Sequence, residues 1–226
     1  MNRRGRPNKN DSPPTAPARL TKATLLKGAK WLASVDPALE GVLEKHGPPP
    51  LLRRPATFAT LVHIILEQQV SVESAKSTFD RLKATSEGTL TPEHVTELGP
   101  DRLRELGFSR QKARYAAALA DDCTSGRFRI DQLSKQSDEE VQTTICARLG
   151  LGTWSAEVFM MMALLRPDVF PVGDLALVKG IKELDDFEYD GAEAIMERGE
   201  SWRPYRSVAT RMVWQHYAHQ RKRDLF

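Results

Sequence analysis

The stretch that decides the fold is Leu149-Gly150-Leu151-Gly152-Thr153-Trp154-Ser155-Ala156. Two glycines flank a leucine here, and glycine lets the backbone turn more tightly than a residue with a side chain does. A capping box at Ser137-Asp138-Glu139-Glu140 precedes it, and apolar residues then recur every four positions from Val141 through Leu149. The following segment, Ala156 to Leu165, is apolar on nearly every face. The pattern predicts a helix, a glycine hairpin and a buried second helix, whose first backbone N–H groups can hold a phosphate.

Composition sets broad limits on the class of protein. The chain has 226 residues, of which 40% are hydrophobic and 28% charged, as in an ordinary globular protein with one core, perhaps divided into two lobes. It has no apolar run of membrane-spanning length and no signal-peptide core. Its two cysteines, Cys123 and Cys146, are far apart, which favours a reducing compartment and excludes a four-cysteine iron–sulfur cluster. We therefore expect a cytoplasmic protein, associated with the nucleoid in a bacterium.

The basic charge is concentrated at the amino terminus. Residues 1–20 contain five basic side chains and one acidic one, so they contribute +4 to a total of +3, and the remainder carries −1. Bulk charge of the folded part therefore does not argue for nucleic-acid binding, and any such affinity must come from a local patch, from backbone amides or from the tail. The prolines and charges of residues 1–18 predict a disordered basic tail.

Helix signals cover most of the rest of the chain, and strand signals are absent. The segment Gly47-Pro48-Pro49-Pro50 is typical of a rigid, non-helical connector. Thr91-Pro92-Glu93 is a helix start with proline at the first position. The sequence predicts an all-α fold, with helices near Thr21–Val35, Phe58–Gln69, Ser71–Leu82, Pro100–Leu106, Arg110–Thr124 and Tyr205–Arg221.

Four motifs occur in an order that resembles a known family. They are Leu66-Glu67-Gln68-Gln69-Val70-Ser71, the hairpin Gly150–Ala156, Phe170-Pro171-Val172-Gly173-Asp174 and Trp202-Arg203-Pro204-Tyr205-Arg206-Ser207. Together, over about residues 50–220, they resemble the helix–hairpin–helix superfamily of DNA glycosylases, in particular its 3-methyladenine DNA glycosylase II branch. The resemblance implies a domain over residues 19–226, with the hairpin motif at about 138–165. It also implies two helical lobes with a cleft between them, and a monomer that binds damaged double-stranded DNA.

The resemblance implies a chemistry in which one carboxylate is central. Members of this family flip a damaged nucleotide out of the duplex and cut the bond between base and sugar. The transition state is cationic at the sugar, so a fixed carboxylate can stabilise it and orient a water molecule. Asp174 stands where the family places that residue. An aspartate after a Pro/Gly turn is also a common helix N-cap, which is the alternative interpretation of Asp174.

Trp154 separates two reaction classes within this superfamily. Relatives that also nick the strand carry a lysine two residues after the second hairpin glycine, where it forms a Schiff base. Here that position is Trp154, which has no amine nucleophile. The resemblance therefore implies a monofunctional glycosylase that lacks lyase activity and acts in base excision repair on alkylated bases such as 3-methyladenine and 7-methylguanine.

The resemblance also assigns residues that bind DNA and the flipped base. Gln69 matches the wedge that fills the gap in the duplex, and Trp154, Trp214 and Val158 match positions of the base pocket, where some relatives have an aromatic residue in place of Val158. The residues implied in phosphate binding are Gly150, Gly152, Thr153 and Ser155. No cofactor is expected, although hairpin carbonyls can hold a monovalent cation. His216 and His219 lack a third ligand, so no metal site is predicted.

Some features depart from the family pattern or stay ambiguous. Arg148 and Leu149 replace the usual apolar-then-proline entry to the hairpin, and Glu67 stands where glycine is common. Arg110, Lys112 and Arg114 are candidates for phosphate contacts or for a solvated helix face. Two alternative functions stay open: a non-catalytic module that binds distorted duplex, and a monofunctional glycosylase for deaminated or oxidised bases.

Overall fold

The computed structural model describes residues 15–86 and 88–222, and every regular element within these ranges is a helix. The prediction of an all-α fold is therefore confirmed. The chain divides into two compact units, which we describe separately. Among the described residues, unit 1 comprises 15–51 and 165–222, and unit 2 comprises 52–86 and 88–164. Most of the expected basic tail, residues 1–14, lies outside the described ranges.

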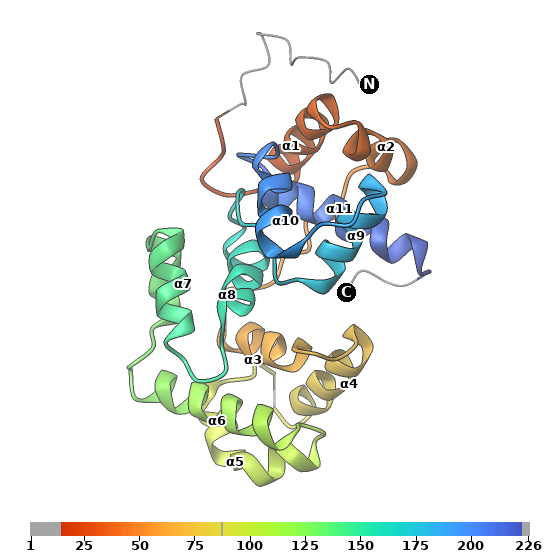
Figure 1. The fold of residues 1–226 in the computed structure, drawn as a ribbon. Coiled ribbons are helices and arrows are strands. Elements are labelled where there is room, and N and C mark those ends of the chain that lie inside the picture. Colours follow the sequence, from red (N-terminus) through yellow and green to blue (C-terminus); the bar gives the residue numbers. More distant parts are fainter. Residues whose placement is uncertain (1–14, 87, 223–226) are drawn as a thin grey trace. The chain divides into compact units, whose positions relative to one another are not determined.

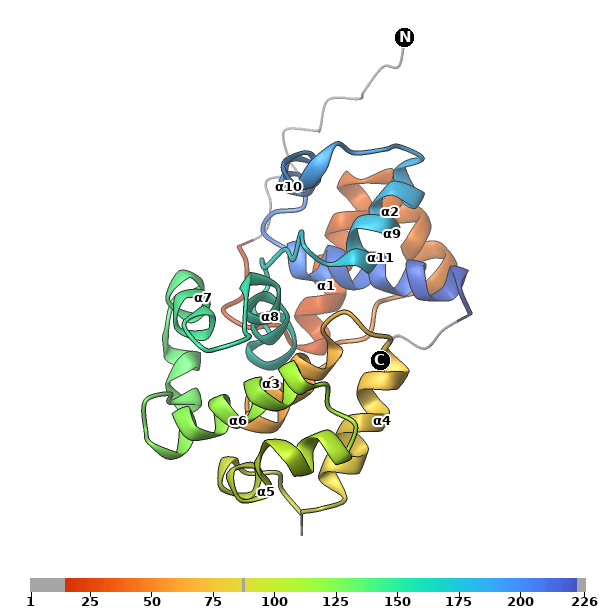
Figure 2. The ribbon, with the colours of Figure 1, turned by 60° about the horizontal axis from the view of Figure 1, so that its bottom comes forward.

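Unit 1 is organised around its last helix. Its helices are α1 (Lys22–Val35), α2 (Pro37–His46), α9 (Leu175–Asp185), α10 (Gly191–Glu200) and α11 (Arg206–Gln220). Helix α11 packs against α1, α2 and α9, as both ribbon views allow the reader to follow (Figures 1 and 2). Residues 206–215 of α11 are all buried, so the helix is enclosed on every face rather than along one stripe.

A buried polar network ties α2 and α10 together within unit 1. Asp36 caps α2 through the backbone N–H of Ala38, and its other oxygen accepts the indole N–H of Trp202 at 2.6 Å. Arg198 of α10 reaches that same oxygen at 2.7 Å and also binds Asp185 with two hydrogen bonds. Because each buried charge is paired, the network fixes the position of α10.

Unit 2 is built around α3 (Phe58–Glu67), which packs against three helices. Those are α4 (Val72–Lys83), α6 (Arg110–Thr124) and α8 (Thr153–Phe159). Most of α3 is buried, which agrees with its nearly continuous apolar run. The remaining elements of unit 2 are α5 (Pro92–Glu105), the 3-10 helix η1 (Ile130–Lys135), α7 (Asp138–Cys146) and the π-helix η2 (Met160–Leu164).

For the helices that were predicted, local signals placed most boundaries correctly, with three differences. Helix α5 begins at Pro92 and continues past a kink at Gly99, whose φ is +68°, so the short helix expected near residues 100–106 is its second half. The expected single helix over 156–165 changes to π geometry at Met160. Leu149, expected in the apolar repeat, lies beyond the end of α7 and is 46% exposed. In the described part of the chain, no helix is both long and apolar enough to cross a membrane.

Candidate functional site

Asp174 lies in unit 1 at the amino end of α9, where it is the N-cap. Its Oδ1 atom accepts the backbone N–H of Leu177 at 2.8 Å. The same oxygen accepts the indole N–H of Trp214, on α11, at 2.9 Å. The N-cap interpretation of Asp174 is therefore correct, but it does not exclude a chemical role, because Asp174 also has a side-chain partner forty residues away in the sequence.

The segment that leads to Asp174 is held by the start of α11. Arg206 donates to both carboxylate oxygens of Asp168, each at 3.0 Å, and to the Asp168 carbonyl at 2.8 Å. Ser207 accepts the Val169 N–H at 2.9 Å and donates to the Val169 carbonyl at 3.1 Å. Both residues come from the motif Trp202–Ser207, so this motif has a structural task that sequence reasoning had not assigned to it.

The glycine hairpin lies in unit 2, between the end of α7 and the start of α8. Gly150 has a φ of +81°, in the left-handed region, and a Cβ on it would overlap the ring of Tyr115. Gly152 differs from it, since its φ is −103° and a Cβ there would meet no atom within 4 Å. Only the first glycine is therefore required by the protein's own backbone and packing.

The loop between α3 and α4 is bound to the hairpin. Gln68 Nε2 donates to the Gly150 carbonyl at 2.8 Å and to Ser155 Oγ at 3.2 Å. The side chain of Ser155, expected to contact phosphate, is buried and used in this internal contact. Gln69, the expected wedge, is exposed and has a φ of +56°, a conformation that non-glycine residues rarely adopt.

Lys112, a candidate for a phosphate contact, bonds to the protein's own backbone. Its ammonium group donates to the Leu66 carbonyl at 2.7 Å, near the carboxyl end of α3. Burial lowers the pKa of this lysine. Arg110 and Arg114 are exposed on the same helix, which is compatible with phosphate contacts and with a solvated helix face.

The residues expected in the base pocket differ in exposure. In unit 2, Trp154 is half-buried and Val158 is 3% exposed, whereas Trp214 in unit 1 is 4% exposed. Their assignment to a common pocket stays a prediction, as does the cleft between the lobes.

Two of the three departures from the family pattern, Glu67 and Arg148, have internal partners. Glu67 forms two hydrogen bonds with Arg54, at 2.6 and 2.9 Å, so its negative charge is compensated. Arg148 pairs with Asp122 of α6 at 3.1 Å, with its guanidinium over the ring of Phe128. Leu149 is the exposed member of the three.

A histidine cluster in unit 1 was not expected from the sequence. The ring of His46 stacks on His219, with centroids 4.4 Å apart, and lies 5.7 Å from the ring of His216. Sequence reasoning found only the two histidines of α11, because His46 is distant in the chain. Within residues 15–86 and 88–222, no group of three or more His, Cys, Asp or Glu side chains has a geometry that could hold a metal ion.

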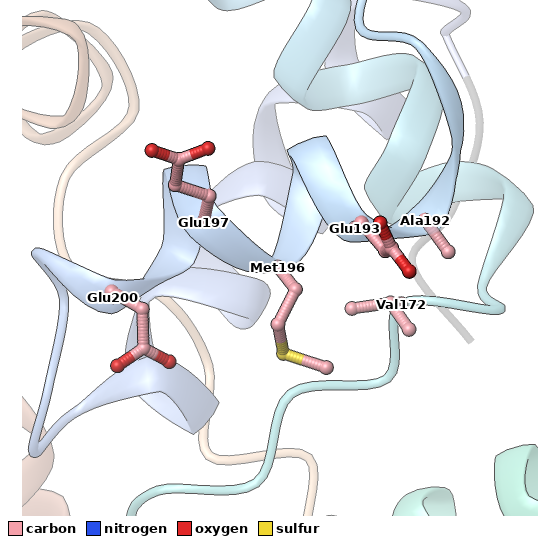
Figure 3. Close-up of a pocket in the computed structure, with 6 residues that line it drawn as sticks. All are labelled: Val172, Ala192, Glu193, Met196, Glu197 and Glu200. Atoms are coloured by element: carbon pink, nitrogen blue, oxygen red, sulfur yellow. The ribbon is translucent and has the colours of Figure 1, made fainter.

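A surface hollow of about 440 Å³ lies in unit 1 beside α10. Figure 3 shows Val172 and Met196 pointing toward one another at this hollow, with carboxylates nearby. Its acidic members are Glu193, Glu197 and Glu200. Glu200 pairs with Arg203 and Arg206, whereas Glu193 and Glu197 disfavour a phosphate, so we assign no DNA-backbone contact to this hollow.

The comparisons with known proteins agree with this architecture. Residues 62–204 match the model of the family described as the HhH-GPD superfamily of base excision DNA repair proteins. The chain belongs to this superfamily. The matched range includes the hairpin, Gln69, Trp154 and Asp174 but ends before Trp214.

Individual relatives carry related names. A crystal structure of a DNA-3-methyladenine glycosidase from Bacillus halodurans is 32% identical, with a TM-score of 0.72, covering 88% of this chain and 91% of that one. A Schizosaccharomyces pombe 3-methyladenine DNA glycosylase in complex with abasic DNA has a TM-score of 0.76 at 22% identity, covering 86% and 97%. A Bacillus subtilis relative with a provisional DNA-3-methyladenine glycosylase name is 26% identical over 188 residues. The chain spans 65% of that relative's length, and the match covers 79% of this chain.

Proposed function

We propose that this protein is a monofunctional DNA glycosylase that removes alkylated purines, such as 3-methyladenine and 7-methylguanine, in base excision repair. Membership of the HhH-GPD superfamily and the names of the relatives support a glycosylase of this type. The observation that carries the proposal is the carboxylate of Asp174, held at the amino end of α9 by donors from two helices.

Asp174 would act on the sugar of the flipped nucleotide. Alkylation at a purine ring nitrogen leaves positive charge on the base, so the bond from C1′ to the base breaks with its electron pair leaving on the base. The sugar then becomes cationic, and the fixed carboxylate stabilises that charge. The oxygen of a water molecule bonds to C1′, and its proton passes to Asp174 or to solvent. A strong general acid is not required for such a leaving group.

The absence of strand cleavage is part of the proposal. A lyase step needs an amine that forms a Schiff base with the sugar. The position at which bifunctional relatives carry that lysine is Trp154. We therefore expect an intact abasic strand as the product.

Double-stranded DNA with damaged bases is the proposed partner of a monomeric enzyme. Gly150, Gly152 and Thr153 would hold a backbone phosphate at the start of α8, and Gln69 would fill the space left by the flipped nucleotide. We retain Trp154, Val158 and Trp214 as members of the base pocket. A monovalent cation on the hairpin carbonyls would share the Gly150 oxygen with Gln68, since that oxygen already accepts one hydrogen bond.

The test is base release by the wild type and by Asp174→Asn. Methylated duplex is incubated with each protein, free bases are identified by chromatography, and duplex binding is measured in parallel. We expect release of 3-methyladenine and 7-methylguanine by the wild type, and loss of release with retained DNA binding in the variant. Equal release by the variant would reject Asp174 as the catalytic residue.

Further arms of this assay separate the alternatives. A non-catalytic module would bind distorted duplex but release no base from any substrate. Release confined to duplexes that contain uracil, hypoxanthine or 8-oxoguanine would favour the glycosylase for deaminated or oxidised bases. Incision of the strand without added base or heat would contradict the exclusion of lyase activity.

A further inference from the structure

The indole of Trp214 is a fixed hydrogen-bond donor to Asp174. It lies within the buried run of α11, is 4% exposed, and its N–H reaches Asp174 Oδ1 at 2.9 Å. The same oxygen accepts Leu177 N–H at 2.8 Å. Two donors on one oxygen, one from the backbone of α9 and one from a side chain of α11, determine the plane and direction of the carboxylate.

Helix α11 also fixes the beginning of the segment that ends at Asp174. Arg206 binds the carboxylate and the carbonyl of Asp168, while Ser207 bonds both backbone groups of Val169. One rigid helix therefore holds residues 168–169 through its first turn and residue 174 through Trp214, two turns further on. The segment cannot shift at Asp174 without breaking a contact to α11.

We propose that Trp214 is a positioning residue, whose N–H aims the Asp174 carboxylate at the charge that develops on the sugar. This inference rests on the proposed function of Asp174. Electrostatic stabilisation depends on a carboxylate that is already oriented before the reaction, so a carboxylate that can rotate is less effective. The role belongs to the N–H edge of the ring, and it is separate from any stacking of a base on the ring face.

The replacement Trp214→Phe tests this role because it keeps an aromatic ring and removes the donor. Trp202→Phe is the matched control, since Trp202 is 1% exposed in the same unit and its N–H donates to a different carboxylate, Asp36, at 2.6 Å. Both variants lose one buried indole–carboxylate bond. Only Trp214→Phe loses one that reaches Asp174.

Two measurements distinguish positioning from general stability. In single-turnover release of 7-methylguanine, we expect Trp214→Phe to be about 10- to 100-fold slower at saturating enzyme, and Trp202→Phe to stay within about twofold of the wild type. In binding assays, we expect the wild type to prefer a cationic pyrrolidine abasic analogue over the neutral tetrahydrofuran analogue. Trp214→Phe should lose that preference while keeping its affinity for the neutral analogue.

A second variant covers the case in which the phenylalanine ring disturbs the core. Benzothienylalanine at position 214, introduced by codon suppression, keeps the indole shape but replaces the N–H with sulfur, and it should show the same loss. The inference is overturned if either folded variant keeps both the wild-type rate and the preference for the cationic analogue. If the wild type releases no alkylated base, the proposed function fails, and if Asp174→Asn keeps base release, the catalytic role of Asp174 and the positioning role of Trp214 fail together. If Asp174→Asn is inactive while the Trp214 variants are normal, only the positioning role fails.

Discussion

Gln68 joins two parts of unit 2 that are distant in the sequence, since its Nε2 atom donates to the Gly150 carbonyl at 2.8 Å, across 82 residues. Gln68 precedes the exposed Gln69, and Gly150 is the glycine that makes the hairpin turn possible. The expected wedge and the expected phosphate site therefore share one hydrogen-bonded connection. Because this bond joins the two loops directly, we expect a change in one loop to affect the other.

Replacing Gln68 with methionine should weaken this connection. Methionine has a similar length but no donor, so the Gly150 carbonyl loses a partner, and we expect the free energy of unfolding to fall by about 1 kcal/mol. Affinity for a duplex with an abasic-site analogue should fall about threefold to tenfold. Urea unfolding and fluorescence anisotropy provide the two readings. Gln220→Met, at an exposed glutamine at the end of α11, is the control and should stay within about 0.5 kcal/mol. Wild-type values for both quantities in Gln68→Met would refute the coupling.

The two hairpin glycines should respond differently to alanine. Gly150→Ala forces a side chain into the left-handed region and against Tyr115, so we expect a loss of about 2–4 kcal/mol in the free energy of unfolding. Gly152→Ala meets open space at an ordinary φ, so its stability should change by less than about 0.5 kcal/mol.

DNA affinity, rather than stability, should reveal the effect of Gly152→Ala. The Cβ of Gly152→Ala would stand where a phosphate approaches the start of α8, and we expect about tenfold weaker duplex binding by a fully folded protein. If Gly152→Ala binds duplex as tightly as the wild type, the proposed phosphate contact at Gly152 is wrong.

Local sequence signals predicted those parts of the fold that local physics determines. The capping box at Ser137 and Glu140 forms as expected at the start of α7, and Thr91 caps α5. Helices α2 and α10 were not predicted, although α2 has clear local signals in its N-cap Asp36 and in Pro37, and α9 was anticipated only through the N-cap interpretation of Asp174. The π-helix at Met160–Leu164 was also missed, since a run of apolar residues does not distinguish one helical geometry from another.

Candidate residues could be predicted from their motifs, but their partners could not. The order of the motifs pointed to Asp174 and Gln69, whereas the contacts of Asp174 with Trp214 and of Glu67 with Arg54 depend on the fold. Two glycines looked equivalent in the sequence, and only backbone dihedral angles and the position of Tyr115 distinguish them. The role of Arg206 was likewise hidden, because its partner Asp168 lies 38 residues away.

The histidine cluster of unit 1 should make stability depend on pH. Burial, the neighbouring histidines and Lys45 lower the pKa of His46, and burial is also the largest cause that lowers the pKa of His216, which Glu183 partly opposes. The unfolded chain therefore binds more protons than the folded one below about pH 6.5, so stability rises with pH in that range and falls on acidification. Each extra proton bound on unfolding contributes up to about 1.4 kcal/mol per pH unit.

Urea unfolding between pH 5 and 8 checks this dependence. His46→Asn should reduce the slope of stability against pH below about 6.5, because the ring of His46 no longer titrates. The offset of the variant at pH 8 measures its loss of packing, so the slope can be read independently. An identical slope in the two proteins would show that the cluster does not govern the acid response.

Gln69 offers a test in which stability and function should move in opposite directions. Its φ of +56° costs a non-glycine residue about 1–2 kcal/mol, so Gln69→Gly should keep or raise the free energy of unfolding, by up to about 1 kcal/mol after the added chain entropy is subtracted. Gln69→Ala keeps the unfavourable conformation and serves as the matched comparison.

If the glutamine fills the gap left by a flipped nucleotide, both Gln69 variants should bind a tetrahydrofuran-containing duplex about tenfold more weakly than the wild type. Their affinity for an undamaged duplex should stay within about twofold of the wild type. Urea unfolding and anisotropy titrations with the two duplexes give the comparison. A more stable Gln69→Gly protein that retains full affinity for the abasic analogue would show that the strained glutamine is not the wedge.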